Sequence, residues 1–294
     1  MSNKFAYGRM NARESKTGEC RAMILSVPIH LFEHEMYHQT YTLHSTYQHT
    51  QNYCHGKELV ALHDKSRIPS PMGIILLYDA WAFERLKAVL RTVRVEEHAI
   101  TINDVRVLKT DVRLSRHDLK QTICSHRPLG EGERKVLQGA IEDEIRCAGL
   151  RQLPELERRA DLLGTALARK QGVADAIKAL IGFGEGLTPS GDDIVCGLLA
   201  GLLYTGAMEL FEIAGTTVLS IIDDEKVTSQ VSRSFLKFGG KGLFIETLVT
   251  LYERLAAHES IGELVQIIGG LGHRSGTDYL MGIQLGLQLG GSDR

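Results

Sequence analysis

The sequence IGFGEGLTPSGDDIVCGLLAGLLYTG, residues 181–206, joins a glycine-rich loop to an apolar run. Its first three glycines stand at every second position and keep the chain out of regular structure, because glycine alone reaches positive φ at little cost. Thr188-Pro189 or Ser190 then fits the start of a helix, since proline suits the first turn and serine suits the cap. We therefore expect a glycine loop that leads into a buried helix.

The same pattern returns about 85 residues further along the chain. Residues 190–202 and 275–287 both read Ser-Gly-x-Asp-x-x-x-Gly-x-x-x-Gly-Leu. The two later glycines of each copy lie on one helix face, where they let another backbone approach closely. We predict that the two helices pack together about a pseudo-twofold axis with neighbouring N-termini. Two positive dipole ends and two sets of free N–H groups would then suit an anion or a polar substrate.

Helix capping is the simpler interpretation of the polar residues in both copies. Ser190 with Asp193, and Ser275 with Asp278, each fit a capping box, in which serine and acid bond the backbone amides of their own helix. Capping does not explain the glycine loop or Asp192, so we favour a ligand site. Its carboxylates would repel a phosphate unless Mg²⁺ or an arginine lies between them, and an amide or a metal is the alternative occupant.

The segment between the two copies carries further polar residues. By spacing, Ser229, Ser232 and Arg233 are assigned to one helix face, and Lys241 is flanked by glycines. A solvated polar face fits this pattern as well as an anion-binding role for Arg233 or Lys241 does. The loop before Thr188 is not a Walker loop, because no lysine precedes the threonine.

Bulk properties exclude several classes of protein. The chain has 294 residues and a net charge of −2, which give no electrostatic footprint for nucleic acid or an acidic membrane. It has no apolar run of about 18 residues and no signal-peptide pattern at its start. The five cysteines are scattered, without a C-x-x-C pair, which is typical of reduced thiols. We expect a cytoplasmic protein.

Hydrophobic periodicity divides the chain into parts. Residues 1–20 are polar and unpatterned, and we expect a flexible N-terminus. Residues 21–128 show mostly period two, with a helix over 81–90, and predict a small β-rich domain that is barrel-like or sandwich-like. Residues 129–294 show period 3.6 and predict an all-helical domain with the two glycine helices at its core. The predicted fold class is α+β.

The N-terminal part also contains an H-E-x-x-H motif, His34-Glu35-Met36-Tyr37-His38. In a zinc peptidase the two histidines sit at i and i+4 on one helix face, with the glutamate as general base. Here strand-like sequence follows almost at once, and no third ligand stands at the usual spacing. Histidines are frequent in residues 30–63, so a chance match is the stronger interpretation.

Two motifs resemble the signature pair of a bacterial protein family. They are GLTPSGDD at residues 186–193 and GHRSGTD at residues 272–278. The family includes the smallest subunit of the three-protein oxamate carbamoyltransferase of anaerobic allantoin breakdown. The likeness extends to PMGIIL at residues 71–76 and to the serine-rich helix at 229–238, although the first motif is the specific one.

This resemblance implies a subunit that takes part in phosphorolysis of a carbamoyl amide. Oxalurate and phosphate would give oxamate and carbamoyl phosphate. The implied partners are a carbamoyl compound, phosphate, and either other transferase subunits or further copies of the chain. A non-catalytic metabolite-binding or assembly subunit is the alternative function. No cofactor is implied with certainty, and Mg²⁺ stays open.

The resemblance transfers no catalytic residues, so the candidate site rests on the residues themselves. The acids would orient an amide or hold Mg²⁺, and His273 would shuttle a proton near neutral pH. The candidates for chemistry are Asp192, Asp193, Asp278 and His273. The candidates for substrate binding are Gly184, Gly186, Thr188, Ser190, Gly191, Arg233, Arg274, Ser275 and Gly276.

Overall fold

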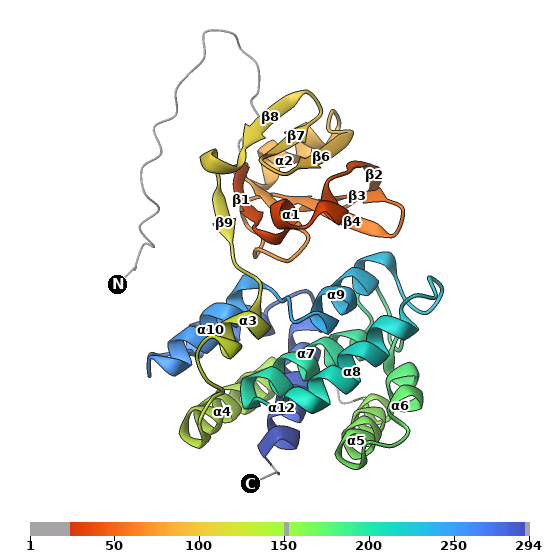
Figure 1. The fold of residues 1–294 in the computed structure, drawn as a ribbon, viewed down its shortest axis with the longest axis vertical. Coiled ribbons are helices and arrows are strands. Elements are labelled where there is room, and N and C mark those ends of the chain that lie inside the picture. Colours follow the sequence, from red (N-terminus) through yellow and green to blue (C-terminus); the bar gives the residue numbers. More distant parts are fainter. Residues whose placement is uncertain (1–23, 150–152, 292–294) are drawn as a thin grey trace.

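The computed structural model describes residues 24–149 and 153–291 and shows a β-rich part followed by a helical part (Figure 1). All strands lie within residues 24–115, and the long helices follow. The predicted α+β class is thus confirmed. The predicted flexible N-terminus, residues 1–20, lies outside the described residues.

The strands form one curled sheet, closer to the barrel-like alternative than to two stacked sheets. Their order is β8-β7-β6-β2-β3-β4-β5-β1-β9. The β4–β5 and β1–β9 pairs are parallel, and the other pairs are antiparallel. The strands are β1 (Ile24–Pro28), β2 (Thr40–Thr46), β3 (Thr50–His55), β4 (Glu58–His63), β5 (Gly73–Leu76), β6 (Thr92–Glu96), β7 (Ala99–Ile102), β8 (Val105–Leu108) and β9 (Arg113–Ser115).

Short helices interrupt the strands. The helix predicted over residues 81–90 is present as α2 (Ala80–Lys87), capped by Asp79, whose carboxylate accepts the Ala82 N–H at 2.9 Å. The others are α1 (His30–Glu33) and the 3₁₀ turns η1 (Glu35–Tyr37) and η2 (Lys109–Asp111). Phe83 on α2 is fully buried in the core of the sheet. Buried and less buried residues alternate along β6, as the sequence predicts, whereas β4 and β5 are buried over consecutive residues.

The helical part surrounds one buried helix, α7, nearly all of whose residues are enclosed. The helices are α3 (Leu119–Cys124), α4 (Glu131–Ala148), α5 (Pro154–Arg169), α6 (Val173–Leu180), α7 (Ser190–Thr205), α8 (Met208–Ile221), α9 (Gln230–Gly240), α10 (Glu246–Ala256), α11 (Gly262–Gly269) and α12 (Ser275–Gly291). A boundary at residue 128 stays a prediction, and α3, which precedes it, contributes Leu119 and Ile123 to the helical core.

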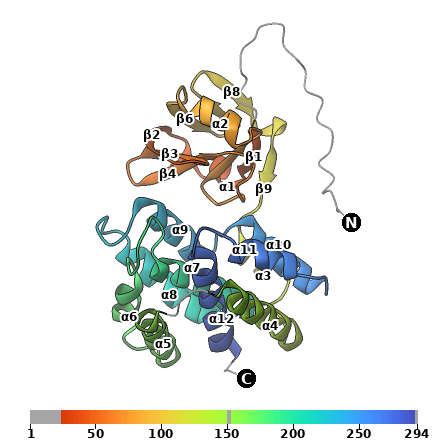
Figure 2. The same cartoon turned by 180° about the vertical axis from the view of Figure 1, so that it is seen from behind.

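Helices α7 and α12 cross at the centre of the helical part in both views (Figures 1 and 2). A Cβ atom at Gly197 would overlap the carbonyl oxygen of Tyr279, and one at Gly282 would overlap that of Ile194. These two contacts are equivalent under the 85-residue repeat, since 194 and 197 correspond to 279 and 282. The helices therefore pack with approximate twofold symmetry, and only glycine fits where their backbones touch.

Helix α9 connects the two parts of the molecule. Lys237 forms an ion pair with Glu58 at the start of β4. Phe238 lies 5.3 Å from the ring of His30 and belongs to the hydrophobic cluster of the sheet. The opposite end of α9 lies beside the glycine loop, where Ser229 donates a hydrogen bond to the carbonyl of Leu187. One helix therefore contacts both the sheet and the loop before α7.

Candidate functional site

At the N-termini of α7 and α12, the serine of each helix is paired with the aspartate of the other helix. The Ser275 hydroxyl of α12 acts on the carboxyl of Asp193 in α7 and lowers its pKa, and the Ser190 hydroxyl of α7 acts in the same way on the pKa of Asp278 in α12. The prediction of a capping box at Ser190 is wrong. A cap needs non-helical backbone, and in α7 that position is Pro189, with no side-chain cap bond, while Ser190 is already helical. We call Ser275 with Asp193, and Ser190 with Asp278, the crossed pairs.

Asp193 has an unfilled hydrogen-bonding position. Its Oδ2 atom is enclosed and has no hydrogen-bond partner among the described residues. Burial raises the pKa of Asp193 well above its ordinary value, and the neighbouring carboxylates of Asp278 and Asp192 raise it further. A buried polar atom without a partner costs about 1–3 kcal/mol. A donor on a bound molecule would remove that cost.

Thr188 extends the crossed pairs into the glycine loop. Its hydroxyl lies 2.7 Å from that of Ser275, which is the hydroxyl that lowers the pKa of Asp193. Gly184 has a φ of +120°, and a Cβ atom there would lie 2.7 Å from the Ser190 nitrogen. Gly186 has a φ of +94°. Glycine at both positions lets the loop fold tightly over the start of α7, as the sequence predicts.

Both carboxylate oxygens of Asp192 accept hydrogen bonds from within the protein. It is 1% exposed, and its Oδ1 atom accepts the Gly182 N–H at 2.7 Å. Its Oδ2 atom accepts hydrogen bonds from the hydroxyls of Ser232, at 2.6 Å, and Thr228. Burial raises the pKa of Asp192, and these three donors oppose the rise. Asp192 therefore ties the loop, α7 and α9 together, and Thr228 is a residue that the sequence analysis missed.

Asp278 is fully buried and already paired with a cation. The Nε atom of Arg274 lies 3.0 and 3.1 Å from its two oxygens. Burial raises the pKa of Asp278, and the hydrogen bond from Ser190 and the charge of Arg274 oppose that rise. His273 is exposed on the loop that precedes α12. The structure thus brings Arg274 to the site and leaves His273 at its solvent side.

The backbone N–H groups at both helix starts are largely bonded within the protein. The amides of Asp192 and Asp193 donate to the carbonyl of Pro189 at 2.9 and 3.2 Å, and Gly191 donates to Phe183 at 2.9 Å. In α12, Gly276 donates to Leu271 at 2.9 Å. The expectation of two sets of free N–H groups is wrong at these four positions, because carbonyl groups of the protein accept their hydrogen bonds.

Comparison with known families supports the resemblance seen in the sequence. Residues 180–287 match the family model described as oxamate carbamoyltransferase subunit AllH. The match supports membership in the AllH family. The part matched to AllH starts at the end of α6 and contains the glycine loop, the crossed pairs and α9. No solved structure matches the chain.

Arg233 and Lys241, for which an anion-binding role and a solvated polar face fit the sequence equally well, bond or act elsewhere in the structure. The buried guanidinium of Arg233 donates to the carbonyl of Glu225 at 3.2 Å, and its charge acts on Cys54 in β3. Consecutive helical residues point about 100° apart, so Ser232 faces Asp192 and Arg233 does not. Lys241 is exposed, and its charge acts on His30 at the contact between α9 and the sheet.

The H-E-x-x-H residues do not form a zinc-peptidase helix. His34 and His38 flank a three-residue 3₁₀ turn, and the Nε2 atom of His38 lies 3.0 Å from the carbonyl oxygen of Phe32. Within residues 24–149 and 153–291, no group of three or more His, Cys, Asp or Glu is placed to hold a metal ion. No helix in the described ranges is long and apolar enough to cross a membrane.

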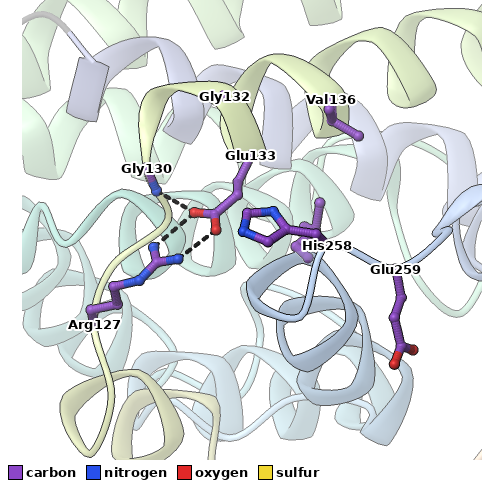
Figure 3. A pocket seen from close by; sticks show the side chains of 8 residues that line it. Arg127, Gly130, Gly132, Glu133, Val136, His258 and Glu259 are labelled. Atoms are coloured by element: carbon purple, nitrogen blue, oxygen red, sulfur yellow. Dashed lines mark hydrogen bonds and ion pairs between the residues drawn. The ribbon is translucent and has the colours of Figure 1, made fainter.

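A pocket of about 500 Å³ lies at the start of α4, away from the crossed pairs (Figure 3). Arg127 forms a forked ion pair with Glu133, whose carboxylate also accepts the Gly130 N–H. The Arg127 guanidinium is the main cause that lowers the pKa of Glu133 to about 2. His258 lies beside this carboxylate in Figure 3. Arg127 and Glu133 in the pocket lining are thus paired with each other at the beginning of α4.

Proposed function

We propose that the chain is an oxamate carbamoyltransferase subunit whose crossed pairs bind the carbamoyl substrate. A phosphate oxygen attacks the terminal carbamoyl carbon of oxalurate. The bond from that carbon to the inner nitrogen breaks, and the nitrogen takes a proton. The products are oxamate and carbamoyl phosphate. The match to the AllH family supports the subunit assignment, and the reaction and site are our proposal.

The observation that carries this proposal is the unfilled Oδ2 atom of Asp193. A carboxyl oxygen that is enclosed and unbonded among the described residues is costly unless a ligand completes it. The carbamoyl NH₂ group offers two hydrogen-bond donors. Asp193 would accept one of them and fix the orientation of the carbamoyl carbon, which is the positional contribution to catalysis. His273, exposed beside Arg274, would supply the proton to the leaving nitrogen.

Turnover of the assembled transferase tests the proposal. The chain is combined with the other transferase subunits, and carbamoyl phosphate formation from oxalurate and phosphate is measured. Asp193→Asn replaces the unfilled acceptor with an amide donor of nearly the same shape. We expect turnover to fall about tenfold or more, since a misdirected hydrogen bond at a reacting group costs at least about 1.4 kcal/mol.

Asp161→Asn is the matched control, because Asp161 is exposed on α5. It should leave turnover unchanged. If Asp193→Asn folds with the melting temperature of the parent and also leaves turnover unchanged, Asp193 has no part in the reaction.

An assembly role is the second candidate, and α2 carries the observation that favours it. Trp81, the single tryptophan of the chain, is 70% exposed. The Arg85 guanidinium lies over its ring at 4.7 Å, and Val89, two residues after the end of α2, is also exposed. Exposed tryptophan with arginine is typical of energetically important interface residues. Under this alternative, Trp81→Ala would prevent co-purification with the other subunits, while Asp193→Asn would have no effect on turnover.

A further inference from the structure

The charges around Asp193 are unfavourable for an anion. Besides burial, the groups that act most strongly on its pKa are the Ser275 hydroxyl and the carboxylates of Asp278 and Asp192, and no cation is among them. Arg274 is the cation of the site, and its Nε atom already bonds both oxygens of Asp278. A phosphate beside Asp193 would therefore meet three acidic side chains, with little positive charge to compensate its own.

The backbone N–H groups at the helix starts also offer an anion few hydrogen bonds. Helix N-termini bind anions through N–H groups that lack an intrahelical partner. At the start of α7 the N–H groups of Gly191, Asp192 and Asp193 donate to carbonyls of the protein, and Gly276 in α12 does the same. Bonded amides cannot turn to a ligand without breaking these turns.

The hydrogen-bonding groups that remain are suited to a neutral donor. The Oδ2 atom of Asp193 is an acceptor without a partner among the described residues. The Thr188 and Ser275 hydroxyls, 2.7 Å apart, can each accept as well as donate. An amide NH₂ group would satisfy the carboxyl oxygen and add no charge to the buried site.

We propose, resting on the proposed function, that this site takes the uncharged carbamoyl NH₂ end of the substrate and does not bind phosphate. The cations that hold phosphate then come from another subunit of the transferase. The complete active site forms where that subunit meets the N-termini of α7 and α12. Because the two substrates are bound by different subunits, a carbamoyl site can be lined by carboxylates in an enzyme whose second substrate is an anion.

Calorimetric titration of the full chain with four probes tests this inference. Acetylurea carries the carbamoyl amide without a carboxylate, oxalurate carries both, and oxalate and phosphate carry only negative charge. We expect acetylurea and oxalurate to bind, and oxalate and phosphate not to bind. Asp193→Asn should weaken acetylurea binding about tenfold or more, because a donor would then face the amide donors. Asp161→Asn should bind acetylurea as the parent does.

Ser275→Ala provides a second variant if Asp193→Asn fails to fold. It removes the hydroxyl that lowers the pKa of Asp193 and keeps the carboxyl, so we expect acetylurea binding to weaken several-fold. Phosphate binding that depends on Asp193 or Ser275 would overturn the inference, and so would failure of acetylurea to bind the folded parent chain. The proposed function would survive either result if turnover of the assembled transferase still depended on Asp193. It would fail if turnover did not.

Discussion

The hydroxyl that lowers the pKa of Asp193 on α7 belongs to Ser275, the first residue of α12, and not to Ser190 on its own helix. The mirror interaction joins Ser190 to Asp278. In neither copy of the repeat, therefore, is the serine paired with the aspartate of the same helix. The candidate site exists only because two helices far apart in the sequence cross at their glycines.

A double-mutant cycle distinguishes the crossed pairs from helix capping. We expect Asp193→Ala and Ser275→Ala to couple by about 0.5–3 kcal/mol in the free energy of unfolding, as interacting residues do. Asp193→Ala and Ser190→Ala should couple less, because those two side chains do not bond each other. The measurement is urea unfolding of the single and double variants. Stronger coupling within α7 would restore the capping box.

The glycines between α7 and α12 should tolerate no side chain. Gly197→Ala places a methyl group against the carbonyl oxygen of Tyr279, and we expect a loss of about 3 kcal/mol or more, since even simple overpacking costs about 1–3 kcal/mol. Gly139→Ala is the control, because nothing lies within 4 Å of its Cβ position on α4. It should stabilise the protein by about 0.5–1 kcal/mol through helix propensity. Equal urea midpoints for the two variants would contradict the packing described above.

Asp192 should matter for stability more than any exposed acid. Asp192→Ala leaves the donors on Gly182, Thr228 and Ser232 without their acceptor. We expect a loss of about 3 kcal/mol or more, because each unsatisfied buried donor costs about 1–3 kcal/mol. The exposed Asp161→Ala serves as the control in the same urea titration. A loss below about 0.5 kcal/mol at Asp192, the range of ordinary surface changes, would show that its three hydrogen bonds are not stabilising.

Two buried histidines should make the protein less stable in mild acid. Burial is the main cause that lowers the pKa of His30 to about 3 and that of His117 to about 4, whereas the unfolded value is 6.5. The unfolded chain binds more protons between these values, so stability is complete above pH 6.5 and falls as the pH drops toward the folded values. Each histidine contributes up to about 1.4 kcal/mol per pH unit in that window.

His30→Phe isolates this effect. The ring of His30 packs against Tyr37 and Phe238, and phenylalanine keeps these contacts. The buried aspartates with raised pKa act in the opposite direction in parent and variant alike, so the difference between the two reports the histidine. Urea unfolding at several pH values from 8 to about 5 measures it. Identical slopes below pH 6.5 would contradict the assignment.

The sequence predicted the repeat, the glycine contact and the loop because each depends on spacing along the chain. It did not predict the crossed pairs, since a capping box in one helix and an exchange between two helices need the same serine and aspartate. The sequence did not predict that the N–H groups at the helix starts are already hydrogen-bonded. Their acceptors, such as the Pro189 carbonyl, are backbone atoms that any residue carries. The spacing also placed Ser232 and Arg233 on one helix face, whereas Ser232 bonds Asp192 and Arg233 bonds the carbonyl of Glu225.

A structure of the chain with bound oxalurate tests the central claim most directly. The account predicts the terminal carbamoyl nitrogen at about 2.7–3.2 Å from the Oδ2 atom of Asp193, the ordinary hydrogen-bond range, with the carboxylate of oxalurate directed away from Asp193 and Asp278. Oxalurate bound elsewhere, or bound with its carboxylate at the N-termini of α7 and α12, would contradict it.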